Sequence, residues 1–117
     1  MPRQSVLEMP LSRVYPLLVQ KAERKGRTKA EVDTVICWLT GYDEAELERR
    51  VQAGIPYGAF FEEAPQMNPA RMKITGSICG VRVEEIEDPL MHSIRCLDKL
   101  VDELAKGRSM EKILRTV

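Results

Sequence analysis

The chain of 117 residues has the usual size of one folded domain, and we expect residues 1–117 to form a single domain. Lys plus Arg and Asp plus Glu each number 18, so the formal net charge is zero, which argues against a protein dedicated to nucleic-acid binding. The composition, with 44% hydrophobic and 31% charged residues, is that of a folded soluble protein. No apolar run has the length of a signal peptide or membrane span, so we expect a cytoplasmic location without membrane contact.

The N-terminal segment contains two prolines within residues 1–11 and little periodicity, which predicts a loosely ordered lead-in. Ser12 is a suitable cap for a helix that begins at Arg13, and Pro16 then falls near its first turn. Gly26 follows a basic last turn and ends this helix. The predicted apolar stripe consists of Val14, Leu17 and Leu18.

Two further helices are indicated by their start and stop residues. Thr28 and Glu31 have the spacing of a capping box, and Gly41 stops the helix that follows. Asp43 resembles the cap of another helix, which Gly54 ends. The residues at helical spacing are Val32, Val35, Ile36 and Leu39 in the first and Leu47 and Val51 in the second.

The segment from residue 70 to residue 86 permits two interpretations. Asn68-Pro69 is a helix start signal, and a helix that continues from it would place Gly76 and Gly80 one turn apart. The alternative is a small β-hairpin around Met72–Val83. We favour the helix and keep the hairpin as the alternative.

The last part of the chain has the strongest periodicity. Asp88-Pro89 combines a good cap with a residue suited to the first helical position. An unbroken apolar seam follows at spacings of 4, 3, 4 and 3, comprising Leu90, Ile94, Leu97, Val101 and Leu104. Ser109 can cap a final short helix. We therefore predict a compact all-α domain of about five to seven helices, with the helix from Leu90 to Lys106 at its centre.

The candidate reactive residues lie in "ICGVRVEEIEDPLMHSIRC", at residues 78–96. His92 and Cys96 are four residues apart on one helix face, a spacing that can hold a metal. Further ligands would have to come from Cys79, Glu84 or Glu85. We expect instead a surface histidine, turned partly away from the core, and a packed, reduced cysteine. No catalytic motif is present, so we expect no metal, no cofactor and no catalytic residue, although the enzyme question stays open.

Five aromatic residues lie in the middle of the chain, and their first interpretation is core packing. The alternative is a partly exposed groove for a peptide or small ligand. The residues are Trp38, Tyr42, Tyr57, Phe60 and Phe61.

A basic run offers a nucleic-acid patch formed by Lys21, Arg24, Lys25, Arg27 and Lys29. Two short helices follow it, as in a helix-turn-helix, but the second of them carries four acidic residues. We favour the interpretation that these charges complement the end of a helix dipole.

The most favoured function is that of a small interaction or regulatory module that binds a protein partner or a second copy of itself. The long seam and the apolar C-terminal end suggest apolar surface that the domain leaves uncovered. The candidate partner surface consists of Met110, Ile113, Leu114 and Val117. Nucleic-acid binding by the 21–29 segment is the first alternative, and small-ligand or metal binding is the second.

Three long runs carry a family resemblance: "VYPLLVQKAERKGRTKAEVDTVICWLTGY", "FFEEAPQMNP" and "ICGVRVEEIEDPLMHSIRCLDKLVDELAKGRSMEKILR". They resemble a bacterial family known as domain of unknown function 2200, over roughly Tyr15 to Arg115. The resemblance implies a small bacterial protein with one domain. It implies no reaction, cofactor or catalytic residue.

Overall fold

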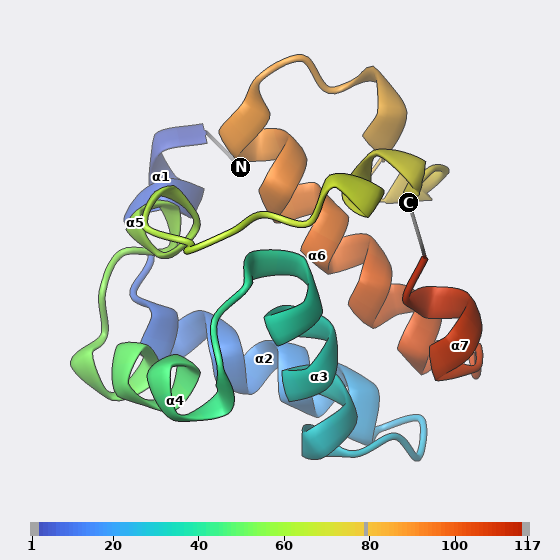
Figure 1. The fold of residues 1–117 in the computed structure, drawn as a ribbon, viewed down its shortest axis with the longest axis horizontal. Helices are drawn as coiled ribbons and strands as arrows, with labels where there is room; N and C mark the ends of the chain where they lie inside the picture. The colour runs from blue at the N-terminus through green and yellow to red at the C-terminus, as the bar shows by residue number, and fades with distance from the viewer. Residues whose placement is uncertain (1–2, 79, 116–117) are drawn as a thin grey trace.

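The computed structural model describes residues 3–78 and 80–115 of the chain, and it is mainly helical (Figure 1). The expected all-α class is confirmed, with the addition of one small hairpin. The elements are α1 (Arg3–Glu8), α2 (Leu11–Glu23), α3 (Lys29–Thr40), α4 (Glu44–Ala53), α5 (Tyr57–Glu62), the 3-10 helix η1 (Pro69–Lys73), β1 (Ser77–Ile78), β2 (Val81–Arg82), the 3-10 helix η2 (Val83–Glu85), α6 (Pro89–Ala105) and α7 (Met110–Ile113).

Helix α6 runs through the middle of the molecule, as the seam predicted (Figure 1). It begins as expected at Asp88, whose carboxylate accepts a hydrogen bond of 3.0 Å from the amide of Leu90. Its apolar face packs against α2 and α3, and each such side chain contributes about 1.5–3 kcal/mol through burial. The residues of this face that are almost fully buried are Ile94, Leu97, Leu100, Val101 and Leu104.

The start of α3 is also confirmed. Thr28 and Glu31 form the complete capping box, because the Thr28 side chain accepts from the amide of Glu31 and the Glu31 carboxylate accepts from the amide of Thr28. Gly41 ends the helix in a left-handed conformation, with φ of 85°. The side chains at helical spacing on this helix are all buried: Val32, Val35, Ile36 and Leu39.

The N-terminal region differs from the predicted lead-in over 1–11. Residues 3–8 form helix α1, which lies beside α5 at one edge of the molecule (Figure 1). Backbone hydrogen bonds of 2.8 Å fix the segment, from Leu11 to Ile55 and from Tyr57 to Met9. Sequence periodicity missed this order because the contacts are with a segment some 45 residues later.

Helix α2 begins at Leu11 rather than at Arg13, so the predicted cap at Ser12 is wrong. The predicted stripe is also shifted, because Leu17 is 54% exposed. The residues of α2 that do face the core are Leu11, Val14, Leu18, Val19 and Ala22.

The helix favoured for residues 70–86 is wrong, and the alternative hairpin within Met72–Val83 is correct. Strands β1 and β2 pair antiparallel, with Ser77 opposite Arg82 and Ile78 opposite Val81. Gly76 has φ of 107°, a value that no right-handed helix contains. Gly76 therefore allows the chain to turn directly before the first strand of the hairpin.

Candidate ligand-binding cleft

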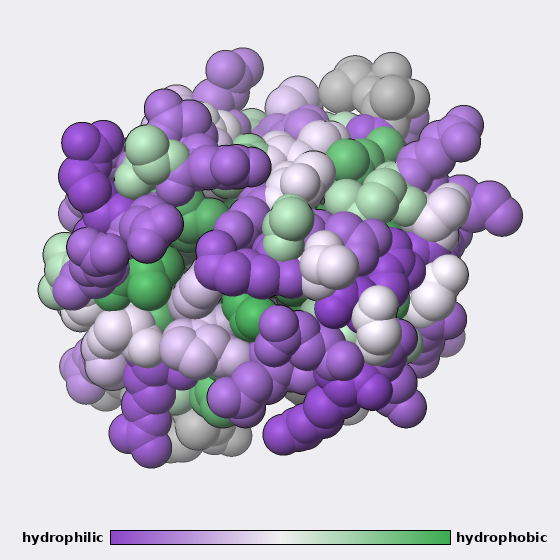
Figure 2. Space-filling view, turned by 90° about the horizontal axis from the view of Figure 1, so that it is seen from below, coloured by the Kyte–Doolittle hydropathy of each residue, from purple (hydrophilic) through white to green (hydrophobic). Residues whose placement is uncertain are grey.

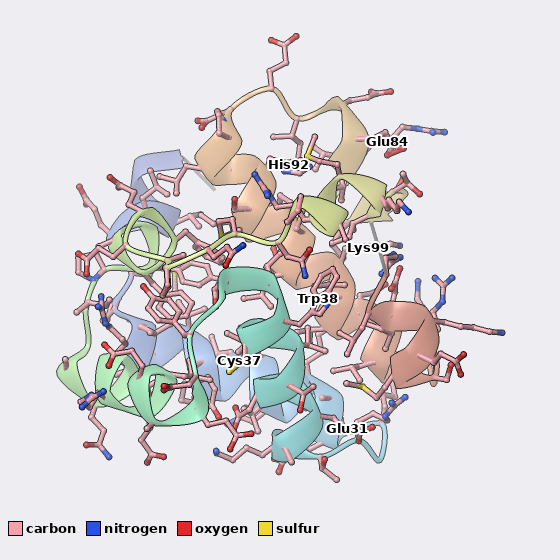
Figure 3. All side chains as sticks on the ribbon, in the orientation of Figure 1. Glu31, Cys37, Trp38, Glu84, His92 and Lys99 are labelled. Atoms are coloured by element: carbon pink, nitrogen blue, oxygen red, sulfur yellow. The ribbon has the colours of Figure 1, made fainter. Side chains whose placement is uncertain are left out.

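A cleft of about 550 Å³ opens between the end of α5, η1, η2 and the first turns of α6. Four segments that are separate in the sequence form its walls, and the hairpin connects two of them, η1 and η2. Its apolar lining comprises Phe61, Met67, Met72, Ile86, Pro89 and Leu90, and its polar lining comprises Glu62, Arg71, Glu84, Glu87, His92 and Ser93. Figure 3 shows His92 between α6 and η1, with Glu84 at the opposite side of this region.

Asn68 fixes the position of η1 against the end of α3. Its side-chain amide donates to the carbonyl of Trp38 at 3.2 Å, and its backbone amide donates to the carbonyl of Leu39 at 2.9 Å. Its side-chain oxygen accepts from the amide of Ala70 at 2.9 Å, which caps η1. The predicted start signal at Asn68-Pro69 is therefore real, but the helix is a short 3-10 helix that carries Arg71 to the cleft.

Gly41 permits this close approach of the chain to α3. A Cβ atom at this position would lie 2.8 Å from the backbone oxygen of Gln66, closer than real Cβ contacts allow. The carbonyl of Thr40 accepts a hydrogen bond of 3.1 Å from the amide of Gln66. The absent side chain thus lets residues 66–68 run directly over the end of α3.

Arg71 is the cation of the cleft. One terminal nitrogen, Nη1, donates to the carbonyl of Asn68 at 2.9 Å. Its Nε is buried and has no hydrogen-bond partner among the described residues. A buried donor without a partner costs about 1–3 kcal/mol. Arg71 therefore holds an unused hydrogen-bonding group inside the cleft wall.

His92 and Cys96 lie together, as their spacing on one helix face allowed, but the expected orientation of His92 toward the surface is wrong. His92 is only 8% exposed, and both of its ring nitrogens are 3.6 Å from the Cys96 sulfur. Burial, with a contribution from the charge of Arg71, lowers the pKa of His92. Burial raises the pKa of Cys96 to about 12, against opposing effects from Arg71 and Arg115. Both groups are thus neutral near pH 7, which is not the ionised pair of a cysteine nucleophile.

The contact with the Cys96 sulfur leaves the ring nitrogens of His92 able to form hydrogen bonds with another group. A point equidistant from both ring nitrogens lies well off the outward direction of either N–H bond or lone pair, so the contact is a poor hydrogen bond. The neutral ring keeps one donor and one acceptor. His92 can therefore bind a group that enters the cleft.

The other residues considered as metal ligands do not join this pair. The Glu84 carboxylate accepts a hydrogen bond of 3.0 Å from the amide of Gly76, and this bond lowers the pKa of Glu84. Glu85 is exposed, and Cys79 lies outside the described residues. Within residues 3–78 and 80–115, no three His, Cys, Asp or Glu side chains form a group that could hold a metal ion.

The predicted nucleic-acid patch is divided in the structure. Lys21, Arg24 and Lys25 meet Lys106 around a hollow of about 380 Å³, with Asp102 between them. Asp102 pairs with Lys106 at 3.0 Å and with Lys21 at 3.6 Å.

The two other residues of this patch are engaged elsewhere. Arg27 donates to the carbonyls of Leu104 and Arg108 at 3.2 and 2.7 Å, which ties the α2–α3 turn to the end of α6. Lys29 pairs with Asp33 at 2.8 Å.

The predicted partner surface is largely covered. Ile113 is fully buried, and Met110 and Leu114 are partly buried against the core. Val117 lies outside the described residues. Arg115 pairs with the buried Glu103 at 2.7 Å and holds the segment after α7 on α6. The C-terminal residues thus complete the core instead of exposing a stripe.

Core packing is the correct interpretation for most of the aromatic residues. The rings of Tyr42 and Phe60 stack with centroids 4.7 Å apart, and the Tyr42 hydroxyl donates to the carbonyl of Phe60 at 2.7 Å. Tyr57 is buried, and Trp38 is partly buried against the core (Figure 3). Phe61 both packs in the core and lines the cleft.

Sequence reasoning missed Arg71 and the two methionines of the cleft, Met67 and Met72. The start signal at Asn68-Pro69 was the available clue, since it places Arg71 in the first turn of a helix. Nothing local in the sequence indicates that this turn faces His92.

The chain belongs to the family described as an uncharacterized protein conserved in bacteria (DUF2200), which matches residues 5–115. The match confirms the resemblance that the three long runs indicated. The fold is similar to the crystal structure of uncharacterized protein SP1917, with a TM-score of 0.92 and 47% sequence identity, over 97% of this chain and 93% of that chain. No curated protein matches the chain. None of the helices in the described part of the chain is both long and apolar enough to cross a membrane.

Proposed function

We propose that this protein is a binding module for a small, mainly apolar molecule, which it holds in the cleft beside His92. The observation that supports the proposal most strongly is the buried Arg71 Nε without a partner, in a cleft that is otherwise well supplied with apolar side chains. Binding sites for small molecules are typically apolar clefts of about 300–1,000 Å³ with a few polar groups. The volume of about 550 Å³ falls within that range.

Binding without chemistry fits the groups present. A catalytic cysteine requires a base and a depressed pKa, whereas the pKa of Cys96 is raised to about 12. The neutral His92 is better suited to hydrogen bonding than to activating this thiol.

The partner hypothesis that the sequence favoured is less well supported than ligand binding. It rested on an uncovered apolar stripe that included Ile113, and this residue is fully buried. Figure 2 shows a face on which hydrophilic side chains separate several small hydrophobic areas. Small-ligand binding, the second alternative, therefore becomes the leading proposal.

A screen of neutral apolar fragments by ligand-observed NMR tests this proposal. The variant Leu90→Trp replaces an aliphatic side chain of the cleft wall with a larger aromatic one, which fills part of the cleft. We expect it to weaken fragment binding at least tenfold. The matched control Leu17→Trp changes an exposed leucine on α2 and should leave binding unchanged. Circular dichroism first establishes that both variants are folded. Fragments that bind a folded Leu90→Trp variant as well as the parent, or a screen without any binder, would contradict the proposal.

A further inference from the structure

The edge of the Arg71 guanidinium that lacks a hydrogen-bond acceptor is informative about the group that the cleft could bind. Nη1 donates to the carbonyl of Asn68, and the opposite edge consists of the buried Nε and of Nη2. No described residue forms an ion pair with Arg71 or a hydrogen bond with Nε. Two parallel N–H groups on one edge match the two oxygens of a carboxylate, and such bidentate pairs are among the stronger hydrogen bonds in proteins.

We propose that the ligand is a monocarboxylic acid with an apolar chain or ring, whose carboxylate binds the Nε–Nη2 edge of Arg71. This inference rests on the proposed function of the cleft. The apolar part of the acid packs between Met67, Met72 and Leu90, which line the same cleft. His92 supplies a further N–H donor beside the carboxylate.

The rim of the cleft limits the charge of the ligand. Glu62 and Glu87 are exposed there, and Glu84 is held by the amide of Gly76. These carboxylates repel a polyanion as it enters, although water and salt weaken that repulsion. One negative charge that reaches Arg71 is compatible with this rim, whereas a phosphate with two charges is disfavoured.

Access to the arginine requires a movement of side chains, because Nε is buried and no described acceptor contacts it. The cleft walls contain the side chains best suited to such a movement. Met67 and Met72 are unbranched and flexible, and Met72 is 66% exposed. Once these side chains have moved, the carboxylate of the ligand gives Arg71 Nε the hydrogen-bond acceptor that it lacks in the unbound protein.

Four compounds with one apolar body test the inference: 3-phenylpropionate, 3-phenylpropanamide, 3-phenylpropylamine and 3-phenylpropylphosphonate. Affinities are measured by NMR titration of the full chain at a mildly alkaline pH, above the second pKa of the phosphonate, so that this compound carries two negative charges. We expect the carboxylate to bind at least tenfold more tightly than the amide, and the amine and the phosphonate to bind more weakly than the carboxylate.

The variant Arg71→Met separates recognition of the charge from binding of the apolar body. It should bring the affinities for the carboxylate and the amide within a factor of two of each other. The control Arg13→Met changes an exposed arginine on α2 and should keep the preference for the carboxylate. If Arg71→Met does not fold, Arg71→Lys serves instead, and it should reduce the preference because an ammonium lacks the planar edge.

The possible failures are distinguishable. Equal affinities of the parent for carboxylate and amide, or tightest binding of the amine or phosphonate, would overturn the carboxylate inference while the cleft remained a binding site. A preference for the carboxylate that survives Arg71→Met would also overturn it. Failure of all four compounds to bind would contradict both the inference and the proposed function.

Discussion

The charged side chains near the two ends of α6 differ in whether they form ion pairs. At its C-terminal end, the buried Glu103 pairs with Arg108 and Arg115, at 3.2 and 2.7 Å. Asp102 pairs with Lys21 of α2 and with Lys106, which follows the last residue of α6. At the N-terminal end, Arg71 faces the cleft without an ion pair to any described residue.

The ion pairs at the C-terminal end stabilise the fold, whereas the guanidinium at the N-terminal end has no ion-pair partner among the described residues and is, in our proposal, the group that binds the ligand. The paired groups at the C-terminal end join helix α2 and the segment after α7 to the central helix. Among the residues that the structure describes, the Arg71 guanidinium forms a hydrogen bond only with the carbonyl of Asn68. A basic residue in a sequence is therefore informative about binding only after its partners within the fold are known.

The largest expected effect comes from the middle of α6, which both ends share. Leu97 is 1% exposed, so Leu97→Asp would place a charge where water cannot solvate it. We expect a loss of more than ~4 kcal/mol in the free energy of unfolding, which is enough to unfold a small domain. The control Leu17→Asp should change that free energy by less than ~1 kcal/mol. Urea denaturation followed by circular dichroism measures the free energy of unfolding of both variants and of the parent. A Leu97→Asp variant as stable as the parent would show that the seam is misplaced.

The next largest effect concerns the C-terminal end. Glu103→Gln removes the negative charge between Arg108 and Arg115 and should reduce the free energy of unfolding by ~2–3 kcal/mol. Glu111→Gln, at an exposed position of α7, is the control and should have almost no effect. The affinity for 3-phenylpropionate should stay unchanged in both variants. A loss of that affinity in Glu103→Gln would show that the two ends of the helix are not independent.

Arg71→Met should have a smaller effect on stability, within ~1 kcal/mol of the parent. The variant loses one hydrogen bond to the carbonyl of Asn68, but it also removes a buried donor that has no partner. Thermal and urea unfolding of the two proteins measure the difference. A loss above ~2 kcal/mol would mean that Arg71 is mainly a structural residue, like Arg27 at the other end of α6.

The pH dependence of stability tests the environment of His92. Its folded-state pKa is lowered, so the unfolded chain takes up the proton first as the pH falls below about 6.5. Stability should therefore decrease between about pH 6.5 and pH 5, and His92→Gln should lack this part of the decrease. The comparison is a series of urea titrations of both proteins over that range. Parallel curves for parent and variant would place His92 in water instead of in the cleft wall.

The smallest effect is expected at the basic hollow near the end of α2. Arg24→Glu with Lys25→Glu should alter the free energy of unfolding by less than ~0.5 kcal/mol, because both side chains are exposed. We also expect the parent to show no gel shift with duplex DNA near physiological salt. Tight binding to DNA that the double variant loses would restore the nucleic-acid alternative.

Local signals made much of the fold predictable from the sequence. The capping box of Thr28 and Glu31, the Asp88-Pro89 start and the seam of α6 each depend on residues within a few turns of one another. Helix α1 was not predictable in this way, because it is stabilised by contacts with the region of Ile55 and Tyr57.

The cleft was even less accessible to sequence reasoning. Arg71 and His92 are 21 residues apart, and they meet at the cleft because Asn68 binds the end of α3 and the hairpin reverses the chain. The sequence did bring His92 and Cys96 to one helix face. It could not show that burial would keep both neutral, since that burial arises from the tertiary packing, in which the backbone carbonyl of Arg71 lies 4.0 Å from the Cys96 sulfur.

The most direct test of the account is the position at which a carboxylate binds the chain. In ¹⁵N-labelled protein titrated with 3-phenylpropionate, we expect amide shift changes concentrated in residues 67–72 and 86–93, on the walls of the cleft. Changes concentrated instead in residues 21–25 and 102–106 would place the acid at the lysine-rich hollow. That result would contradict the central claim that the unpaired arginine, and not the basic surface, selects the ligand.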